Sequence, residues 1–384
     1  MSHATAAAEA ILDGLRATET ESDAARRLSD RAVRYLHDPG LTGLLAPAAF
    51  GGGQRSPRDL VEAGRLVARA SSSAGWVLMT SGANALVVGR MSGQAQDEVF
   101  RGDPRALIPG GAARWGTCTR AADGYRVSGR WVFVSAVDHG RWVLVGCRGV
   151  PNQERAPCPP IVALIPRQDV EIEDTWFSLG LRGTGSSDVV VDDVFVPRHR
   201  AVNMTRAFLG TVPGITIGLY RLPISCTLAT LLCAAVVGMA ERTRYLFIEQ
   251  SATRRDAHSG LSKVSTAGVQ RRAAEADAEI AHAWGLTEQS CDVLEAAMTA
   301  EEPMPVDARG RVRWNAAYAA ELCRRATERI YAAAGVGATY DTNELQGVVR
   351  DLTTATHHAL LDFDTALETQ GKLLLGVDQF EPVI

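Results

Sequence analysis

The sequence predicts an α+β fold in which a β part lies between two helical parts. Alanine- and leucine-rich segments recur at helical spacing up to about residue 97, and long helical patterns return from about residue 213. Between them, short apolar runs are separated by glycine and proline, which is typical of closely spaced strands. We therefore expect an N-terminal helical domain at 1–106, a central barrel-like β domain at 107–208 and a C-terminal helical bundle at 209–384.

The first helical part carries a clear amphipathic segment. Leu60, Ala63, Gly64 and Val67 follow the three-four rhythm of a helix with one apolar face. The turn Asp38-Pro39-Gly40 interrupts the helical pattern upstream of it. Several helices separated by turns are therefore expected before residue 107.

Two strands stand out in the β part. The glycine-dense stretch 179–188 feeds the run Val189-Val190-Val191, which is typical of a buried strand behind a ligand-facing loop. Glycine in such a loop lets the backbone take left-handed angles and approach a ligand closely. About fifty residues earlier, the segment 129–135 offers a second strand, with Trp131, Phe133 and Ser135 on alternate positions.

The last part begins with a stretch from Leu222 to Ala240 that contains no charged residue. Its length would allow it to cross a bilayer. It contains proline, serine, threonine and glycine, and no polybasic segment flanks it. A helix buried on all sides in a bundle gives the same pattern, and we expect that rather than a membrane span.

Composition points to an enzyme without nucleic-acid or membrane partners. The net charge of −4 gives no basic footprint for nucleic acid or an anionic membrane. The seven cysteines are scattered and form no Cys-x-x-Cys pair, which favours free thiols in a reducing compartment. The first residues show no export signal, so a cytoplasmic location is expected.

Familiar catalytic motifs are missing from the sequence. We find no phosphate loop, no zinc-binding His-Glu-x-x-His helix and no Gly-x-Ser-x-Gly elbow, and expect no metal site. Gly180, Gly183 and Gly185 do not open a helix directly after a strand, as a dinucleotide fingerprint requires. An oxidative enzyme of this kind would take its electrons from its substrate or from another protein.

Adjacent histidines near the C-terminus are the sharpest local signal. His357 and His358 follow a polar helical segment that begins with Arg350 and Asp351. Neighbouring residues on a helix diverge by about 100°, so only one of the two can face a given site. Imidazole supplies an acid or base near neutral pH, so one of the two histidines could be catalytic. Two histidines on a helix surface without any catalytic role would give the same sequence pattern, and this alternative stays open.

Together, these segments resemble the flavin-dependent monooxygenase branch of the acyl-CoA dehydrogenase superfamily, the oxygenase component of two-component (group D) systems. The resemblance rests on the Trp131-x-Phe133-x-Ser135 strand, the 179–197 stretch, and Arg350, Asp351 and His358. It implies reduced flavin (FMN or FAD) and O2 as cofactors, and a C4a-hydroperoxyflavin that oxygenates a mostly apolar aromatic or polycyclic small molecule. A separate NAD(P)H:flavin reductase and a homotetramer are also implied.

The resemblance also assigns roles to residues. It makes His358 an acid or base, and it places Ser135 near flavin N5 or O4, where it hinders loss of peroxide. The expected cofactor-binding residues are Trp131, Phe133, Val134, Ser135, Arg182, Thr184, Ser186 and Arg255. Either Arg254 or Arg255 would reach the flavin of a neighbouring subunit. The expected substrate-binding residues are Trp76, Asn84 and His358.

Two alternatives stay open at this point. An acyl-CoA dehydrogenase needs a positioned carboxylate as its base, and residues 352–361 contain no glutamate. A flavin-binding paralogue without catalysis is the other alternative, since one fold hosts different functions. The chain also departs from the family pattern at Ala136, where glycine is usual, and at Gly347, where arginine is common.

Overall fold

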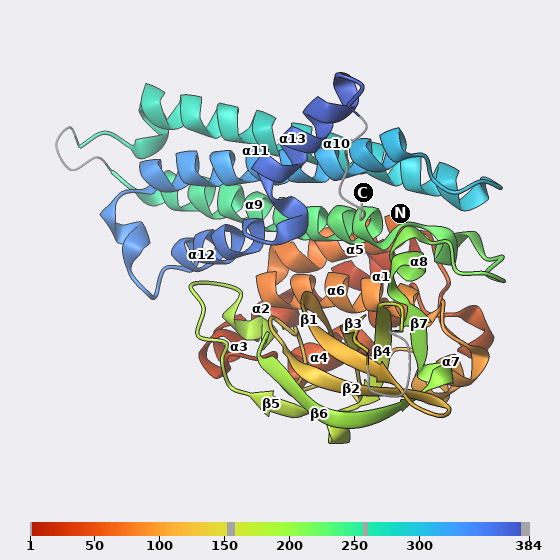
Figure 1. Cartoon of the computed structure of the whole chain (residues 1–384). Helices are drawn as coiled ribbons and strands as arrows, with labels where there is room; N and C mark the ends of the chain where they lie inside the picture. The colour runs from red at the N-terminus through yellow and green to blue at the C-terminus, as the bar shows by residue number, and fades with distance from the viewer. Residues whose placement is uncertain (1, 152–157, 256–259, 378–384) are drawn as a thin grey trace.

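The computed structural model describes residues 2–151, 158–255 and 260–377 (Figure 1). The chain before residue 107 is helical, as the sequence predicts. Its helices are α1 (His3–Glu9), α2 (Leu12–Arg16), α3 (Glu19–Ala25), α4 (Asp30–His37), α5 (Pro57–Ala70), α6 (Ser72–Val88) and α7 (Gly93–Phe100). The short 3-10 turns η1 (Leu41–Gly43) and η2 (Ala48–Phe50) connect α4 to α5.

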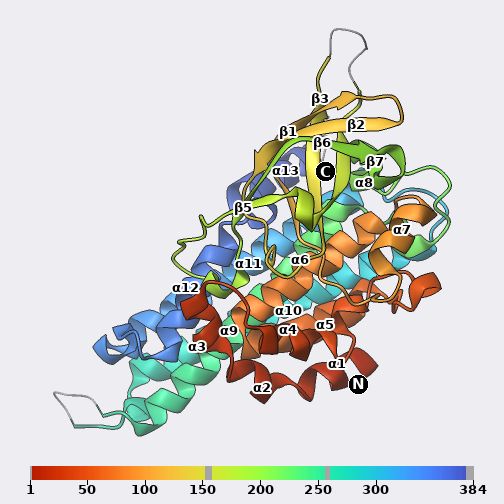
Figure 2. The same cartoon turned by 90° about the horizontal axis from the view of Figure 1, so that it is seen from below.

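The β part is one seven-stranded sheet in the order β5-β6-β2-β1-β3-β4-β7. Only β1 and β3 pair in parallel, and the edge strands β5 and β7 do not pair with each other. Strands β4 and β6 still come close although three strands separate them, so the sheet curls toward the barrel-like form expected (Figure 2). The strands are β1 (Gly110–Arg120), β2 (Gly124–Trp131), β3 (Trp142–Gly149), β4 (Ile161–Pro166), β5 (Glu171–Glu173), β6 (Asp188–Pro197) and β7 (Ala201–Asn203).

Long helices return after the sheet and pack over the N-terminal helices (Figure 1). They are α8 (Met204–Leu209), α9 (Ile224–Thr253), α10 (Ala267–Thr299), α11 (Val306–Ala334), α12 (Glu344–Thr356) and α13 (Phe363–Leu374). Residues of α5, α6, α9, α10 and α11 share one apolar core, whereas the sheet has a core of its own. The two helical parts are therefore packed as one body against the sheet.

The expectation for the uncharged stretch 222–240 is met by α9. Among the described residues, α9 is the one helix long and apolar enough to cross a membrane, but 89% of its apolar window is buried inside the protein. Neighbouring helices cover it on several sides, α5, α6, α10, α11 and α12 among them. A helix surrounded in this way needs no polar face, which explains the missing charges.

Two serines set the boundaries of α5 and α6. Ser56 caps α5 by accepting from the Arg58 amide, with Pro57 at the first helical position. Ser71 ends α5 in extended backbone and caps α6 by accepting from the Ala74 amide. The two helices therefore meet in one tight corner, and this corner places the first turn of α6 beside the β part.

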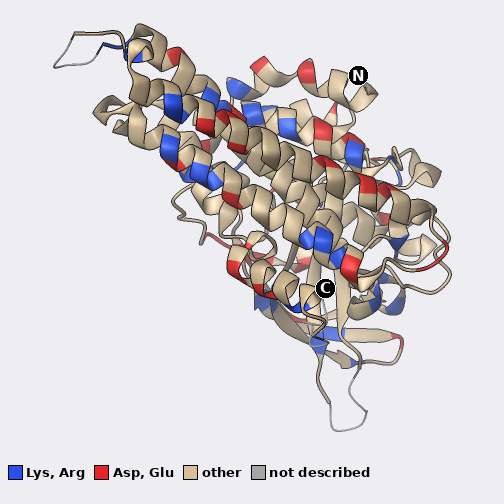
Figure 3. Cartoon of the chain, turned by 90° about the horizontal axis from the view of Figure 1, so that it is seen from above, with Lys and Arg blue, Asp and Glu red and all other residues tan. Residues whose placement is uncertain are grey.

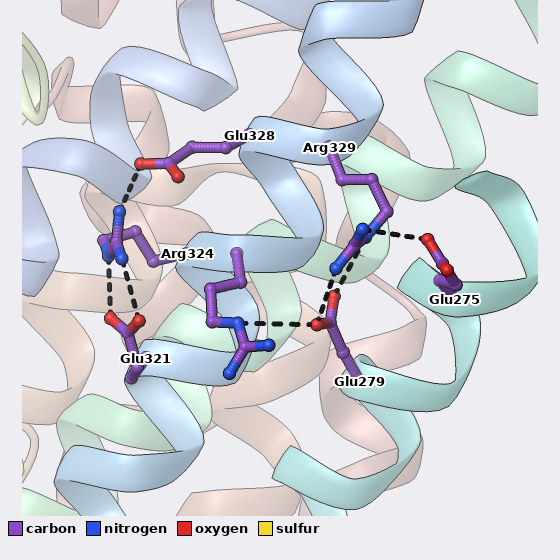
Figure 4. Close-up of polar contacts among 7 residues, drawn as sticks. Glu275, Glu279, Glu321, Arg324, Glu328 and Arg329 are labelled. Atoms are coloured by element: carbon purple, nitrogen blue, oxygen red, sulfur yellow. Dashed lines mark hydrogen bonds and ion pairs between the residues drawn. The ribbon is translucent and has the colours of Figure 1, made fainter.

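Basic and acidic residues are spread along the helices, with both signs mixed (Figure 3). Between α10 and α11, Arg329 binds Glu275 at 2.8 Å and Glu279 at 3.0 Å (Figure 4). Arg324 binds Glu321 and Glu328 within α11 itself. The Arg329 pairs join α10 to α11, whereas the Arg324 pairs lie within one helix, and exposed pairs of this kind add little stability.

Candidate active site

The two strand segments singled out by the sequence meet in space. After β2 ends, the Val134 amide donates to the Ser187 carbonyl oxygen at 3.2 Å, and the Ala136 amide donates to that of Thr184 at 2.8 Å. The segment 133–136 therefore runs along the turn that precedes β6. This turn contains the 3-10 helix η4 (Arg182–Thr184).

Left-handed backbone is concentrated at this meeting point. Phe133 (φ 64°), Ala136 (φ 58°) and Leu181 (φ 51°) adopt it, as does Gly185 (φ 57°). For residues other than glycine this conformation costs about 1–2 kcal/mol each. Such strain is concentrated at functional sites of proteins. The usual glycine in place of Ala136 is explained by the same φ angle.

An exposed apolar surface lies beside these turns. The Phe133 side chain is 61% exposed, and its ring packs edge-on against Trp176 with centroids 6.2 Å apart. Phe177 and Leu179 are also exposed, and the Arg26 guanidinium lies 3.8 Å from the centre of the Phe177 ring. Exposed aromatic groups on a rigid turn form a surface on which a planar ring can lie.

Three hydroxyl groups run inward from this surface. Ser135 Oγ lies 2.8 Å from Ser186 Oγ, which lies 2.7 Å from Thr184 Oγ1. The Thr184 hydroxyl in turn donates to the Leu181 carbonyl oxygen at 2.7 Å. Thr184 and Ser186 are buried, so their hydroxyl groups are occupied inside the protein. Their hydroxyl groups support Ser135, while the expected binding of a flavin by this turn through backbone amides stays a prediction.

The same turn is fastened to α12. The Leu181 amide donates to Asp351 Oδ1 at 2.6 Å, and Arg350 Nη1 donates to the Leu179 carbonyl oxygen at 2.9 Å. A Cβ on Gly180 would come within 2.2 Å of the Arg350 backbone, so only glycine permits this approach. The turn beneath Ser135 and the helix that leads to His358 are therefore one connected unit.

His358 lies immediately beyond the C-terminal end of α12. Its Nδ1 accepts from the Leu360 amide at 3.1 Å, which caps the turn η9 (Ala359–Leu361). Its ring meets the edge of the Trp76 ring with centroids 5.7 Å apart. Burial, together with the nearby Arg313 cation, lowers the pKa of His358 to about 4. At neutral pH the imidazole is therefore neutral, and with Nδ1 accepting, the hydrogen is on Nε2.

Its neighbour faces elsewhere, because α12 ends at Thr356 and His358 adopts extended backbone. His357 is exposed, and its Nδ1 lies 2.7 Å from the Thr353 carbonyl oxygen of its own helix. Of the adjacent pair, His358 is thus the one that contacts Trp76. The two predicted substrate-binding residues Trp76 and His358 are brought together, from α6 and from the end of α12.

Buried carboxyl groups lie behind the turn, and the sequence reading missed them. Burial, together with repulsion from Asp351, raises the pKa of Glu19 to about 8, and burial raises the pKa of Asp351 to about 6. Hydrogen bonds from Ser71 and Ser72 oppose these shifts. Glu19 Oε2 is buried without a hydrogen-bond partner. No sequence signal links Glu19, on a short N-terminal helix, to Asp351 more than three hundred residues away.

Trp131 occupies a different place from the one expected. Its side chain is fully buried in the core of the sheet, and its indole nitrogen donates to the Gly146 carbonyl oxygen at 2.7 Å. A Cβ on Gly116 would lie 2.2 Å from its ring, so the glycine opens the slot that it fills. The indole cannot wall a flavin from there, because no part of it reaches the surface. We correct its role to support of the strand from behind.

The remaining predicted residues hold structural contacts. Asn84 Nδ2 donates to the Ile108 carbonyl oxygen at 2.8 Å, which ties α6 to the start of the sheet. Arg182 Nη1 lies 3.9 Å from the Asp23 carboxylate, and its Nε is buried without a partner. Arg255 Nη1 donates to the Gly260 carbonyl oxygen at 3.0 Å. Each of these three side chains therefore uses at least part of its polar groups for contacts within the protein.

A separate cavity of about 360 Å³ lies at the far end of α9. Its lining residues are Gln250, Thr253, Arg254, Gly337, Asn343 and Glu344. Of the two arginines considered for a neighbouring subunit's flavin, Arg254 therefore borders a hollow. Within the described part of the chain, no group of three histidine, cysteine, aspartate or glutamate side chains could hold a metal ion.

Comparisons with known proteins bear on this geometry. The model of the acyl-CoA dehydrogenase C-terminal domain matches residues 230–363. The flavin-dependent monooxygenase oxygenase subunit HsaA of Mycobacterium tuberculosis is 32% identical over 376 residues, covering 97% of this chain and 95% of its own length. The oxygenase component of an FADH(2)-dependent resorcinol hydroxylase from Rhizobium sp. is 27% identical, covering 96% and 93%.

Solved structures give the same result. The crystal structure of 3-HSA hydroxylase from Rhodococcus sp. RHA1 has a TM-score of 0.93 and 30% identity, covering 100% of this chain and 99% of the other. XiaF from Streptomyces sp., in complex with FADH2 and glycerol, has a TM-score of 0.92 and 25% identity, covering 99% and 96%.

Proposed function

The chain belongs to the flavin-dependent monooxygenases of the acyl-CoA dehydrogenase superfamily, as an oxygenase component, and we propose how its residues divide the work. Reduced flavin lies against segment 133–136, and an aromatic substrate lies between it and the pair Trp76 and His358. The observation that carries this proposal is the bond from the Leu181 amide to Asp351, because it fastens the turn beneath Ser135 to the helix that ends at His358.

The residues around segment 133–136 fit a flavin. Phe133, with Trp176 packed against its ring, offers an exposed aromatic surface for the ring system. The Val134 amide is already bonded within the protein, to the Ser187 carbonyl oxygen. The polar group that this part of the segment can offer to a flavin is therefore the Ser135 hydroxyl. When bound, reduced flavin supplies the two electrons with which O2 is divided between substrate and water.

His358 holds a hydrogen on Nε2 and acts as a donor toward the substrate or the oxygen that is transferred. Its lowered pKa keeps it neutral, and its Nδ1 is occupied by the Leu360 amide. Acting as a base through Nε2 would require the other tautomer and would break that bond. Of the two roles expected for His358, donation is therefore the one that its surroundings support.

An aromatic substrate suits the site better than an acyl thioester. Trp76 presents an aromatic wall beside His358, and no glutamate lies in residues 352–361 to serve as an α-proton base. Relatives of this chain include hydroxylases named for resorcinol and p-hydroxyphenylacetate and a monooxygenase named for indole-3-acetate. A polar aromatic compound of one or two rings is the class we propose.

As an oxygenase component, the chain receives its reduced flavin from a separate reductase. We propose a homotetramer in which the hollow beside Arg254 receives the distal end of a neighbouring subunit's flavin. Arg255, whose Nη1 donates to the Gly260 carbonyl oxygen, would lie at its rim. A cytoplasmic location remains a prediction.

The proposal is tested by anaerobic binding of reduced FMN and reduced FAD, followed by turnover with ¹⁸O2 and an aromatic panel. Wild type should bind at least one reduced flavin and place one labelled oxygen atom in a product. The His358→Ala variant should still bind flavin while releasing more H2O2 and less product, whereas His357→Ala, altered at the exposed neighbour, should behave as wild type.

Two results would overturn the proposal. One is failure of the wild-type protein to bind either reduced flavin. The other is bleaching of its oxidised flavin by acyl-CoA thioesters, which would establish dehydrogenation instead. Full coupling in His358→Ala would remove that residue from the chemistry while leaving the enzyme class in place.

A further inference from the structure

The hydroxyl chain beneath Ser135 has a defined direction. A hydroxyl group has one hydrogen to donate, whereas a carbonyl oxygen only accepts. Thr184 Oγ1 lies 2.7 Å from the Leu181 carbonyl oxygen, a distance at which two oxygens without a hydrogen between them repel. The Thr184 hydrogen must therefore point at Leu181.

The remaining hydrogens then have one arrangement. With its own hydrogen committed, Thr184 can only accept at its 2.7 Å contact with Ser186, so Ser186 donates. Ser186 in turn can only accept at its 2.8 Å contact with Ser135, so Ser135 donates inward. The Ser135 hydroxyl consequently presents lone pairs, and no hydrogen, to the surface beside Phe133.

The inner end of the chain is fixed by several contacts. Thr184 is 1% exposed and Ser186 is 3% exposed, so bulk water does not compete for their hydroxyl groups. The Leu181 carbonyl oxygen also accepts from the Trp176 indole at 2.9 Å, and the Leu181 amide is held by Asp351. The acceptor that orients the whole chain thus cannot turn away.

We propose that Thr184 and Ser186 are positioning residues that make the Ser135 hydroxyl an acceptor, so that the site prefers reduced to oxidised flavin. This inference rests on the proposed placement of the flavin at Ser135. Reduced flavin carries a hydrogen on N5, whereas oxidised flavin carries a lone pair on that atom. An acceptor hydroxyl attracts the first and repels the second, which suits a protein that takes reduced flavin from a partner.

A matched pair of substitutions tests the direction of the chain. Thr184→Val keeps the shape of the side chain but removes its hydroxyl, so Ser186 can turn to donate to Ser135. The Ser135 hydrogen is then free to point at the flavin. Thr184→Ser keeps the hydroxyl and should preserve the wild-type arrangement. Ser135→Ala removes the group altogether.

The readout is the ratio of dissociation constants for oxidised and reduced flavin, measured separately for FMN and FAD. Fluorescence quenching gives the oxidised value and anaerobic equilibrium dialysis the reduced value, with no turnover. Thr184→Val should lower the ratio about tenfold, mainly through tighter binding of oxidised flavin, while Thr184→Ser leaves it unchanged. Ser135→Ala should lower the ratio through weaker binding of reduced flavin only.

The inference and the proposed function fail in different ways. Equal ratios for Thr184→Val and Thr184→Ser, in variants that retain the wild-type melting temperature, would overturn the inference while wild type still oxygenates. If Thr184→Val unfolds, Ser186→Ala provides the same test from the middle of the chain. Failure of wild type to bind reduced flavin would overturn the proposed function itself.

Discussion

The Leu181 amide donates to Asp351 Oδ1 across 170 residues of sequence, and this bond joins the sheet to the C-terminal helices at the candidate site. Leu181 adopts left-handed backbone, so its amide would point elsewhere in an ordinary turn. Gly180 lets the two segments approach, and Arg350 adds a second bond to the Leu179 carbonyl oxygen. The geometry of the turn beneath Ser135 therefore depends on α12 as much as on the sheet.

Removing this carboxyl group should weaken flavin binding. Asp351→Ala leaves the buried Leu181 amide without an acceptor, a loss of about 1–3 kcal/mol that corresponds to roughly tenfold weaker binding or more. Asp351→Asn retains an acceptor oxygen and should stay close to wild type. Equilibrium dialysis with reduced flavin measures the difference. Equal affinity for both variants would show that the turn holds its shape without α12.

The tautomer of His358 can be observed directly. Nitrogen-proton NMR of histidine-labelled protein at pH 7 should show His358 with its hydrogen on Nε2, because Nδ1 accepts from the Leu360 amide. A sample of the His358→Gln variant assigns the signal. The pattern should persist down to about pH 5, since the pKa of His358 is lowered to about 4. Titration near pH 6.5 would contradict the burial that we describe.

Stability should fall as the pH rises from about 4.5 to about 8. The pKa of Glu19 is raised to about 8 and that of Asp351 to about 6, so the folded protein holds protons that the unfolded chain has already released. The contribution of Glu19 is complete below pH 4.5 and is lost as the pH passes 8. Glu19→Gln, which is permanently neutral, should therefore melt higher than wild type at pH 8 and close to it at pH 5.

Glu21→Gln is the control for that experiment, because Glu21 is an exposed residue of the same helix α3. Its melting temperature should follow wild type at both pH values. Thermal unfolding monitored by circular dichroism is sufficient. A Glu19→Gln protein that melts below wild type at pH 8 would mean that the ionised carboxylate stabilises the fold.

Filling the slot for Trp131 should destabilise the sheet. Gly116→Ala places a methyl group about where the Trp131 ring lies, and overpacking of a core costs about 1–3 kcal/mol. Gly93→Ala, where a Cβ meets nothing within 4 Å, should leave stability nearly unchanged. Denaturant unfolding compares the two. Equal stability would show that Trp131 can shift without cost.

The sequence pattern predicted the order of the elements and the helix that precedes His358, because both depend on local periodicity; it did not predict that α12 ends at Thr356, before the two histidines. It misplaced Trp131 because the argument assumed an unbroken strand, in which residues two apart share a face. In the structure β2 ends at Trp131 and Phe133 adopts left-handed backbone, so Trp131 points into the core and Phe133 outward. Periodicity holds no information about where such a break occurs.

The buried polar contacts of the site could not be predicted from the sequence, for a different reason. Glu19 lies on α3, Ser71 in the corner between α5 and α6, and Asp351 on α12, so their mutual placement depends on tertiary packing. The Thr184 and Ser186 hydroxyl groups were recognised as part of a functional turn, but their direction depends on the carbonyl oxygen of Leu181. Residue types predict which groups are available, whereas hydrogen-bond direction follows only from distances.

The buried Arg90 side chain, at the end of α6, donates to the carbonyl oxygens of Ala207, Tyr220 and Leu222. These carbonyl oxygens belong to the segment that leads from the sheet back to α9. The Arg90 guanidinium therefore joins the chain just before the β part to the chain just after it. The β part is thus an insertion closed at its base. Loops of the β part can therefore change in length or sequence during evolution without disturbing the packing of the helices. The same fold can then line its substrate site with different residues for different substrates.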